Sequence, residues 1–248
     1  MEGQRQMNEL NFAALIHDFE VKSKGQSLPI FSINIYQRDI YLSDEKRNSI
    51  ICVFDQIIAD HNKNASDSNF TGDVKGFGSI HRMAIFSDLL KEIEESVLNY
   101  IGSFSRMIDK IQVYHQKSWP VVIKKGGSVD CHKHANADLS AVYYLDVPEG
   151  EGGELIFYSP LTMGLPSNSS GVDFFQPKEY AHAIKPYAGL LLIFPSALKH
   201  EVKTYQGDNP RLSLSFDFTI TASESQGSGM LENLPPAISC WRAFGEID

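Results

Sequence analysis

Two short segments of the sequence carry histidines in a pattern that suits metal chemistry. The first contains His132 and His134 and leads into the strand-like run 139–145, whereas the second places His200 just after the apolar run 190–194. Two residues at positions i and i+2 of a regular strand point to the same face, so the first two histidines could reach one ion. His200 would then approach from a neighbouring strand. Neutral imidazoles suit borderline divalent ions such as iron(II), zinc or copper.

An arginine follows on the next predicted strand. Arg211, Ser213 and Ser215 alternate with apolar residues, so they share one face of that strand. A guanidinium that points into a barrel is costly unless an anion satisfies it. A guanidinium fork beside a hydroxyl makes a good carboxylate receptor, which predicts an anionic ligand near the metal. A salt bridge to Glu154 or Asp217 is the purely structural alternative.

The order of these motifs resembles that of the iron(II)- and 2-oxoglutarate-dependent oxygenases. The resemblance covers about residues 111–221, with His-x-His before Tyr-Tyr-Leu, then Gly-Gly-Glu-Leu at 152–155, Phe-Pro-Ser, a histidine and Arg-x-Ser. It is strongest to a branch of bacterial and phage oxygenases. In that branch the segment matching residues 132–144 reads His-x-His-Pro-x-x-x-Leu-Ser-Gly-Val-Tyr-Tyr.

The resemblance implies a fold, a set of reactants and several residue roles. The fold would be a double-stranded β-helix, and the reactants would be Fe(II), 2-oxoglutarate and O2. His132 and His200 would be iron ligands, while Arg211 with Ser213 would hold the far carboxylate of 2-oxoglutarate, and Tyr144 would bond the same carboxylate. The implied reaction is hydroxylation of a C–H bond with release of succinate and CO2.

The chain departs from the usual family pattern at the third metal ligand. Most members supply Asp or Glu two residues after the first histidine, which completes two imidazoles and one carboxylate. This sequence has His134 at that position. Three interpretations stay open: His134 is itself the third ligand, Asp138 folds back as the carboxylate, or a water or halide fills the position.

The sequence gives less information about the substrate. Trp119, Tyr143, His115 and the loop 161–180 are candidates for the border of a substrate pocket, although core packing accounts equally well for Trp119. A small molecule such as an amino acid or a biosynthetic intermediate is the favoured substrate class, and a protein side chain is the alternative. Two other functions fit the histidines alone, namely a cupin-like metal- or ligand-binding barrel and a three-histidine dioxygenase that does not use 2-oxoglutarate.

The surrounding elements must position these residues. Residues 28–42 predict a strand, and helices are predicted from residue 43 and from residue 87, each with apolar residues at helical spacing. Short alternating strands separated by Gly, Pro and Asn turns then continue from residue 111 to residue 221. We therefore predict an α+β fold with a double-stranded β-helix (jelly-roll, cupin-like) core and N-terminal buttressing helices.

The domain organisation follows from the same patterns. A chain of 248 residues with 42% hydrophobic residues can form one domain. We assign residues 28–222 to a single oxygenase domain, with helical support over 43–108 and the β-helix core over 111–221. Residues 1–27 would form an N-terminal arm. The C-terminal tail 223–248 would be solvated, or docked onto the domain or onto a second subunit in a homodimer.

Charge and apolar runs exclude several classes of partner. The net charge of −9 argues against nucleic-acid binding, and the longest apolar run, 189–195, is too short to span a membrane. Met1 is not followed by the apolar region of a signal peptide. Three widely spaced cysteines favour a reducing compartment, so we expect a cytoplasmic protein.

Overall fold

The computed structural model describes residues 33–61, 68–105, 108–160, 181–223 and 234–240. The chain divides into two units, Met1–Asn34 and Ile35–Asp248, and the second contains all the helices and strands named below. The predicted arm 1–27, the loop 161–180 and most of the tail 223–248 lie outside the described residues.

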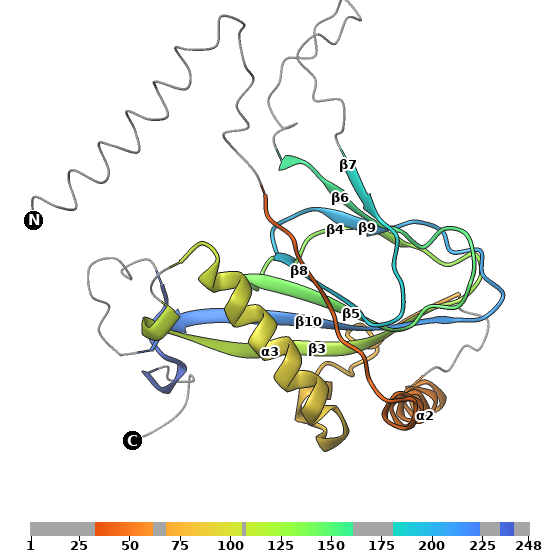
Figure 1. Cartoon of the computed structure of the whole chain (residues 1–248), viewed down its shortest axis with the longest axis horizontal. Helices are drawn as coiled ribbons and strands as arrows, with labels where there is room; N and C mark the ends of the chain where they lie inside the picture. The colour runs from red at the N-terminus through yellow and green to blue at the C-terminus, as the bar shows by residue number, and fades with distance from the viewer. Residues whose placement is uncertain (1–32, 62–67, 106–107, 161–180, 224–233, 241–248) are drawn as a thin grey trace, which may run out of the picture. The chain divides into compact units, whose positions relative to one another are not determined.

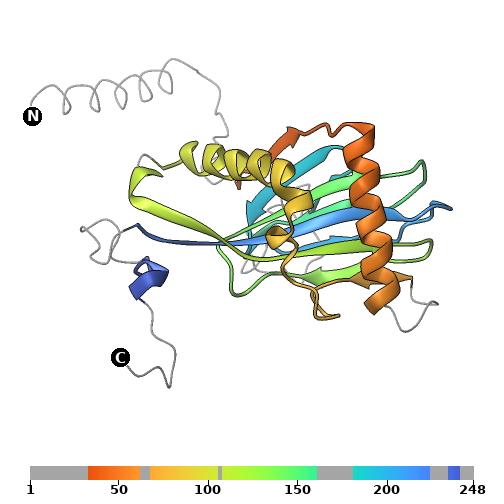
Figure 2. The same cartoon turned by 90° about the horizontal axis from the view of Figure 1, so that it is seen from below.

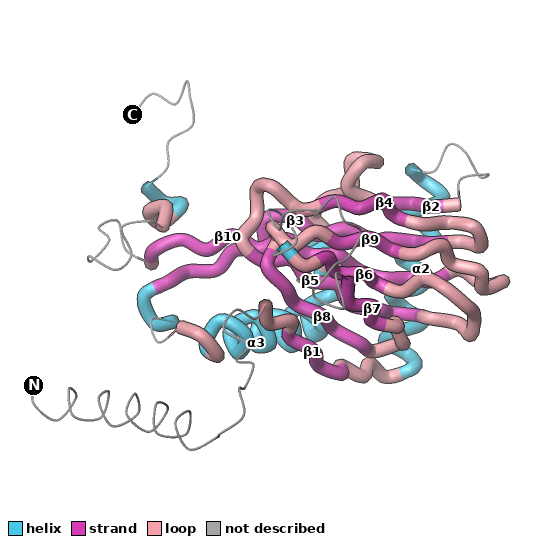
Figure 3. Tube along the Cα trace, turned by 90° about the horizontal axis from the view of Figure 1, so that it is seen from above, coloured by secondary structure: helices cyan, strands magenta, loops and turns pink. Residues whose placement is uncertain are grey.

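Two facing antiparallel sheets form the body of Ile35–Asp248 (Figures 1 and 3). The larger sheet contains, in spatial order, β1 (Tyr36–Asp39), β8 (Leu190–Pro195), β5 (Leu139–Asp146), β10 (Arg211–Ala222), β3 (Ile111–Ile123) and β2 (Asn69–Thr71). The smaller sheet contains β4 (Val129–His132), β9 (His200–Val202), β6 (Leu155–Tyr158) and β7 (Ala181–Ile184). This arrangement is the double-stranded β-helix, so the predicted fold class is confirmed.

Two helices cover the outer face of the larger sheet, α2 (Asp44–His61) and α3 (Ser87–Gly102) (Figure 2). The buried face of α3 repeats at helical spacing through Leu89, Ile93 and Val97, and Asp88 lies in its favourable first turn. Phe54 of α2 is fully buried in the same core. Burial of each such side chain stabilises the fold by about 2 kcal/mol. Four short 3-10 helices complete the described elements: η1 (Ile80–Arg82), η2 (Ala84–Phe86), η3 (Ile108–Lys110) and η6 (Ile238–Cys240).

Strand β10 separates an apolar face from a polar one. Leu212, Leu214 and Phe216 pack in the core beneath the helices. The alternate residues Arg211 and Asp217 are also buried, but they lie on the opposite face because successive side chains of a strand point to opposite sides. The space between the two sheets therefore receives polar side chains from a central strand, which is unusual for a pure packing core.

Apolar side chains fill much of the remaining space between the sheets. Leu155 and Phe157 of β6 pack against Leu192 and Phe194 of β8 in a second core, and Tyr144 of β5 belongs to it. This packing fixes the position of one sheet relative to the other on either side of the polar residues. No helix among the described residues is long and apolar enough to cross a membrane.

Candidate metal and co-substrate site

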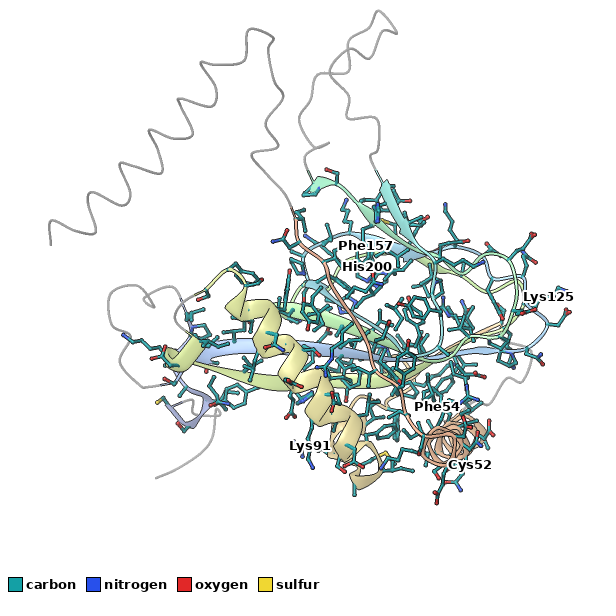
Figure 4. All side chains as sticks on the ribbon, in the orientation of Figure 1. Cys52, Phe54, Lys91, Lys125, Phe157 and His200 are labelled. Carbon is teal, nitrogen blue, oxygen red and sulfur yellow. The ribbon has the colours of Figure 1, made fainter. Side chains whose placement is uncertain are left out.

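His132 and His200 lie directly opposite each other on β4 and β9. Their ring centroids are 4.3 Å apart. His200 is buried between the sheets, where Figure 4 shows it beside Phe157, whose ring centroid is 6.0 Å away. His132 is exposed. The pair therefore has one protected side and one side open to solvent.

His134 joins this pair from a loop and not from a strand. Strand β4 ends at His132, so the i and i+2 geometry expected of a regular strand does not apply. Instead, the backbone N–H of His134 donates to the carbonyl of Ser196, at 2.9 Å. The His134 Nε2 atom lies 3.3 Å from the His132 Nε2 atom. One ligand atom from each of the three histidines lies within 4.8 Å of the others, which is a separation that one ion can bridge.

Each of the three rings has its Nδ1 atom next to a fixed oxygen. The partners of His132, His200 and His134 are Asp130 O at 2.7 Å, Leu198 O at 2.8 Å and Asp217 Oδ1 at 2.5 Å. An Nδ1–H that donates to such an oxygen leaves the lone pair on Nε2, which is the arrangement found in metal-bound histidines. The donor set therefore fits a divalent ion of the borderline class.

The environment of His200 keeps its ring neutral. Burial above all, together with the neighbouring rings of His132 and His134, lowers the pKa of the His200 imidazole to about 4. The hydrogen bond to the Leu198 carbonyl opposes this shift without cancelling it. A neutral ring at pH 7 has its lone pair available for a metal ion.

Asp138, the other candidate for the third ligand, is engaged elsewhere. Its Oδ2 atom accepts a hydrogen bond from the backbone N–H of Ile220 at 2.7 Å. Its own N–H donates to Phe218 O at 2.9 Å, and its carbonyl accepts from the N–H of Ser196 at 3.1 Å. These bonds tie the loop that carries His134 to β8 and β10, and Asp138 contributes no atom to the cluster of ligand atoms.

Sequence reasoning missed the role of Asp217, which it weighed only as a partner of Arg211. In the structure, Asp217 contacts His134 and also accepts a hydrogen bond from Ser140 Oγ at 2.7 Å. The Ser140 hydroxyl lies 2.8 Å from that of Ser196. The signal was a carboxylate on a strand without any other acidic residue, but strand alternation alone cannot identify a partner 83 positions away.

Arg211 is a buried cation without a carboxylate partner among the described residues. Its side chain is 2% exposed, its Nη1 donates to the carbonyl of Gly153 at 2.6 Å, and its buried Nε has no partner. Burial lowers the pKa of Arg211, while the phenol groups of Tyr144 and Tyr205 raise it. A buried guanidinium with an unused donor is a site that an anion would stabilise.

The other residues predicted for the co-substrate lie next to this arginine. Ser213 is buried and pairs directly with Tyr144 across β10 and β5. The guanidinium carbon of Arg211 lies 5.3 Å from the centroid of the Tyr144 ring. Gly153 has a φ of +76°, and a Cβ there would lie 3.1 Å from the Tyr205 ring and 3.4 Å from Arg211 Nη1. The positive φ favours glycine at the position whose carbonyl accepts from the guanidinium.

A cavity of about 420 Å³ opens against Arg211 and Tyr205. Residues 147–150 and 152 line it from the loop between β5 and β6, and residues 185–187 line it from the loop between β7 and β8. None of the three histidines lines this cavity.

The three residues predicted to border a substrate pocket lie in different places. The Trp119 ring is 5.7 Å from that of His134, so it flanks the histidine cluster. Tyr143 is buried in the core beneath the helices, where its hydroxyl donates to Ile40 O. His115 also lies on the helix-covered side, with its Nε2 atom 2.9 Å from Glu94 of α3. Only Trp119 is therefore brought to the cluster.

A β-bulge explains the position of His115. The register between β10 and β3 shifts between Asp217 and Phe218, which pair with Lys117 and His115, so that Gln116 is an extra residue. Without the extra residue, alternation would place residue 115 on the same face as Trp119.

Comparisons with known proteins agree with this geometry. Residues 117–217 match the model of a family described as "Putative 2OG-Fe(II) oxygenase". A search of curated proteins finds no match. Among solved structures, HygX from Streptomyces hygroscopicus with nickel and 2-oxoglutarate bound is 12% identical, with a TM-score of 0.52 over 82% of this chain and 91% of that chain. AviO1 from Streptomyces viridochromogenes Tue57 is 13% identical, with a TM-score of 0.51 over 75% and 90%.

The solved structures share the fold of this domain, and the family match includes Arg211, Asp217 and the three histidines. Residues 117–217 are therefore similar to the putative 2OG-Fe(II) oxygenases, and the domain has the double-stranded β-helix fold that it shares with HygX and AviO1.

Proposed function

We propose that the protein is an Fe(II)- and 2-oxoglutarate-dependent oxygenase that hydroxylates a C–H bond of a small molecule, such as an amino acid or a biosynthetic intermediate. In this proposal Fe(II) is bound by His132, His134 and His200. The carboxylate of 2-oxoglutarate that lies away from the metal is bound by Arg211, Ser213 and Tyr144.

One observation carries the proposal. One nitrogen atom from each of three imidazoles lies within 4.8 Å of the others, and the buried guanidinium of Arg211 has an Nε without a partner among the described residues. A structural protein would have no need for either feature, because both cost free energy until a cation and an anion bind. Together they fit a metal ion and a dicarboxylate.

The bound metal and co-substrate supply the oxidising chemistry: one oxygen atom of O2 enters the substrate as a hydroxyl group and the other enters succinate, with loss of CO2. The residues of the chain have three tasks. Arg211 neutralises and orients the dicarboxylate. Phe157 and Phe194 exclude water from the buried side of His200, with the Phe194 ring centroid 4.9 Å from that of His200. The exposed side of His132 leaves an approach for the substrate.

The substrate class is inferred from the shape and charge of the approach. Trp119 offers an apolar and aromatic wall beside His134, and the Lys117 ammonium lies 5.1 Å from the centroid of the Trp119 ring. This ammonium is already paired with Asp73 Oδ2 at 3.4 Å, so the proposal of a small-molecule substrate rests on the aromatic wall. The net charge of −9 disfavours nucleic acid as the substrate.

The test is anaerobic addition of Fe(II) and then 2-oxoglutarate to the metal-free protein, followed by visible absorption. Chelation of iron by 2-oxoglutarate produces a charge-transfer band, which we expect with the unaltered protein. Arg211→Ala should weaken 2-oxoglutarate binding while Fe(II) still binds. Arg47→Ala is the matched control, since Arg47 pairs with Asp146 at 3.2 Å on the helix side and should leave the band unchanged.

Two outcomes would contradict the proposal. One is the absence of the band with the unaltered protein at saturating Fe(II) and 2-oxoglutarate. The other is an Arg211→Ala protein that binds 2-oxoglutarate as tightly as the unaltered one. The substrate class is tested by succinate release across amino acids, their biosynthetic precursors and peptides. Release with peptides alone would replace the small molecule by a protein side chain.

A further inference from the structure

We propose that Asp217 is a positioning residue that supplies the negative charge of the metal site from one bond further out, through His134. This inference rests on the proposed function, because it assumes that the three histidines bind the metal. It differs from a carboxylate ligand, since the carboxyl group of Asp217 would not touch the ion.

The contact between Asp217 and His134 is short and shielded. The distance between His134 Nδ1 and Asp217 Oδ1 is 2.5 Å, and the two side chains are 15% and 9% exposed. Hydrogen bonds to an ionised acceptor are shorter and about twice as strong as neutral ones. In this shielded position the carboxylate makes the His134 ring a stronger electron donor to whatever its Nε2 atom binds.

Only one of the three ligands has such a partner among the described residues. The Nδ1 atoms of His132 and His200 face the neutral backbone carbonyls of Asp130 and Leu198. These carbonyls fix the ring orientations but add no charge. The negative charge next to the three rings therefore lies on the far side of His134 from the ion. His134 itself occupies the sequence position at which this class of iron site usually has a ligating acid.

Charge balance gives this contact its meaning. Two imidazoles and one carboxylate reduce the charge of a divalent ion by about one unit, whereas three neutral imidazoles leave it unreduced. A carboxylate hydrogen-bonded to the third imidazole lowers the net charge of the site by the same one unit. It does so without occupying a further coordination position. The site would then keep its open positions for 2-oxoglutarate and O2 while avoiding the full charge of the ion.

The surrounding hydroxyls hold Asp217 in place. Ser140 Oγ donates to the same Oδ1 atom at 2.7 Å and lies 2.8 Å from Ser196 Oγ. The carbonyl of Ser196 in turn accepts the backbone N–H of His134 at 2.9 Å. Both partners of the contact are thus anchored to the same serine pair. The Phe-Pro-Ser motif therefore contributes to the metal site although none of its side chains is a ligand.

The experiment separates charge from shape. Asp217→Asn keeps the size of the side chain and removes its charge, while Asp146→Asn removes a carboxylate that pairs with Arg47 away from the site. Fe(II) affinity is measured anaerobically by calorimetry, and the folding of each metal-free protein is checked by circular dichroism. We expect Asp217→Asn to weaken Fe(II) binding by about 10- to 100-fold, and Asp146→Asn to leave it unchanged.

A spectroscopic measurement excludes a merely structural role. With less electron density on the metal, the charge-transfer band of the Fe(II)–2-oxoglutarate complex should move to shorter wavelength in Asp217→Asn, at metal and co-substrate concentrations that saturate the site. A misplaced loop would lower the occupancy without this shift. An affinity and a band position equal to those of the unaltered protein would overturn the inference.

A second variant and a measurement on the unaltered protein complete the test. If Asp217→Asn does not fold, Ser140→Ala tests the same contact, since it removes a donor to Asp217 without changing the charge of the site. A smaller loss of Fe(II) affinity supports the inference, whereas unchanged affinity overturns it. Failure of the unaltered protein to bind Fe(II) would instead refute the proposed function, which distinguishes the two failures.

Discussion

His132 and His200 are register partners on adjacent antiparallel strands, and their ring centroids lie 4.3 Å apart. Directly opposite residues have Cβ atoms about 4.5–5.5 Å apart, so both rings can turn toward one ion without strain. A slip of one residue between β4 and β9 would move one imidazole to the other face of the sheet. The proposed metal site therefore depends on the register of two short strands.

The first prediction distinguishes the two candidates for the third ligand. His134→Ala should abolish the stoichiometric binding of Fe(II), because it removes one of three converging donors. Asp138→Ala should retain binding but lower the free energy of unfolding by about 1 kcal/mol, since the N–H of Ile220 loses its acceptor. Metal titration and urea denaturation measure the two effects. The opposite pattern, with metal lost only from Asp138→Ala, would make Asp138 the ligand.

A second prediction uses the intrinsic fluorescence of the protein. The chain has two tryptophans, Trp119 and Trp241, and the Trp119 ring lies 5.7 Å from that of His134. Binding of Co(II), an absorbing and paramagnetic stand-in for iron, should quench Trp119 because of this short distance. In Trp241→Phe, Trp119 is the remaining tryptophan of the sequence, and its fluorescence should still be quenched. Absence of quenching in Trp241→Phe would place the metal elsewhere.

The third prediction concerns pH. The folded protein holds the pKa of His200 at about 4, whereas the ordinary value is 6.5. As the pH falls below 6.5, His200 becomes protonated in the unfolded chain, whereas in the folded protein it stays neutral until about pH 4. The stability of the metal-free protein should therefore be highest above this window and decrease by on the order of 3 kcal/mol across it.

Urea denaturation at a series of pH values measures this decrease. His200→Gln cannot bind the proton and should show a shallower decline. His182→Gln, which alters an exposed histidine of β7, should follow the unaltered protein. An equally steep decline in His200→Gln would assign the effect to other groups.

A fourth prediction compares two glycines with similar backbones. Gly76 has a φ of +83° and open space where an added methyl group would lie, whereas Gly152 has a φ of +79° and faces the carbonyl oxygen of Thr204. Gly76→Ala should cost about 1 kcal/mol of unfolding free energy from backbone strain alone. Gly152→Ala should cost roughly a further 1–3 kcal/mol from the clash. Chemical denaturation measures both losses. If Gly76→Ala and Gly152→Ala lose the same free energy of unfolding, movement of Thr204 relieves the clash.

Local periodicity and short motifs predicted several of the residues that form this candidate site. Arg211 and Ser213 follow from strand alternation, and the helices that begin near residues 43 and 87 follow from helical spacing. The histidines were found from their motifs, but His134 lies on a loop and not on the strand from which its direction was predicted. Alternation also explains why Tyr143 and Tyr144 cannot both face the space between the sheets, because neighbouring residues on a strand point to opposite faces. The prediction of both as site residues overlooked this constraint.

Contacts between distant segments could not be predicted in the same way. The partnership of Asp217 with His134 depends on how the loop after β4 meets β10, and no local pattern encodes that distance. The position of His115 depends on one extra residue in β3, which shifts every side chain before it to the other face. Such long-range and single-residue effects become visible only in the folded arrangement.

The attachment of the His134 loop to β8 and β10 has a consequence for the opening motions of the domain. His132 and His200 belong to the smaller sheet, whereas His134 is bonded to Ser196 and Asp217 at the larger one. One ion bound to all three rings would therefore link the two sheets, and any motion that separates them would have to release it. Metal should slow the hydrogen exchange of backbone amides in β4 and β9 far more than in α2, which contacts only the outer face.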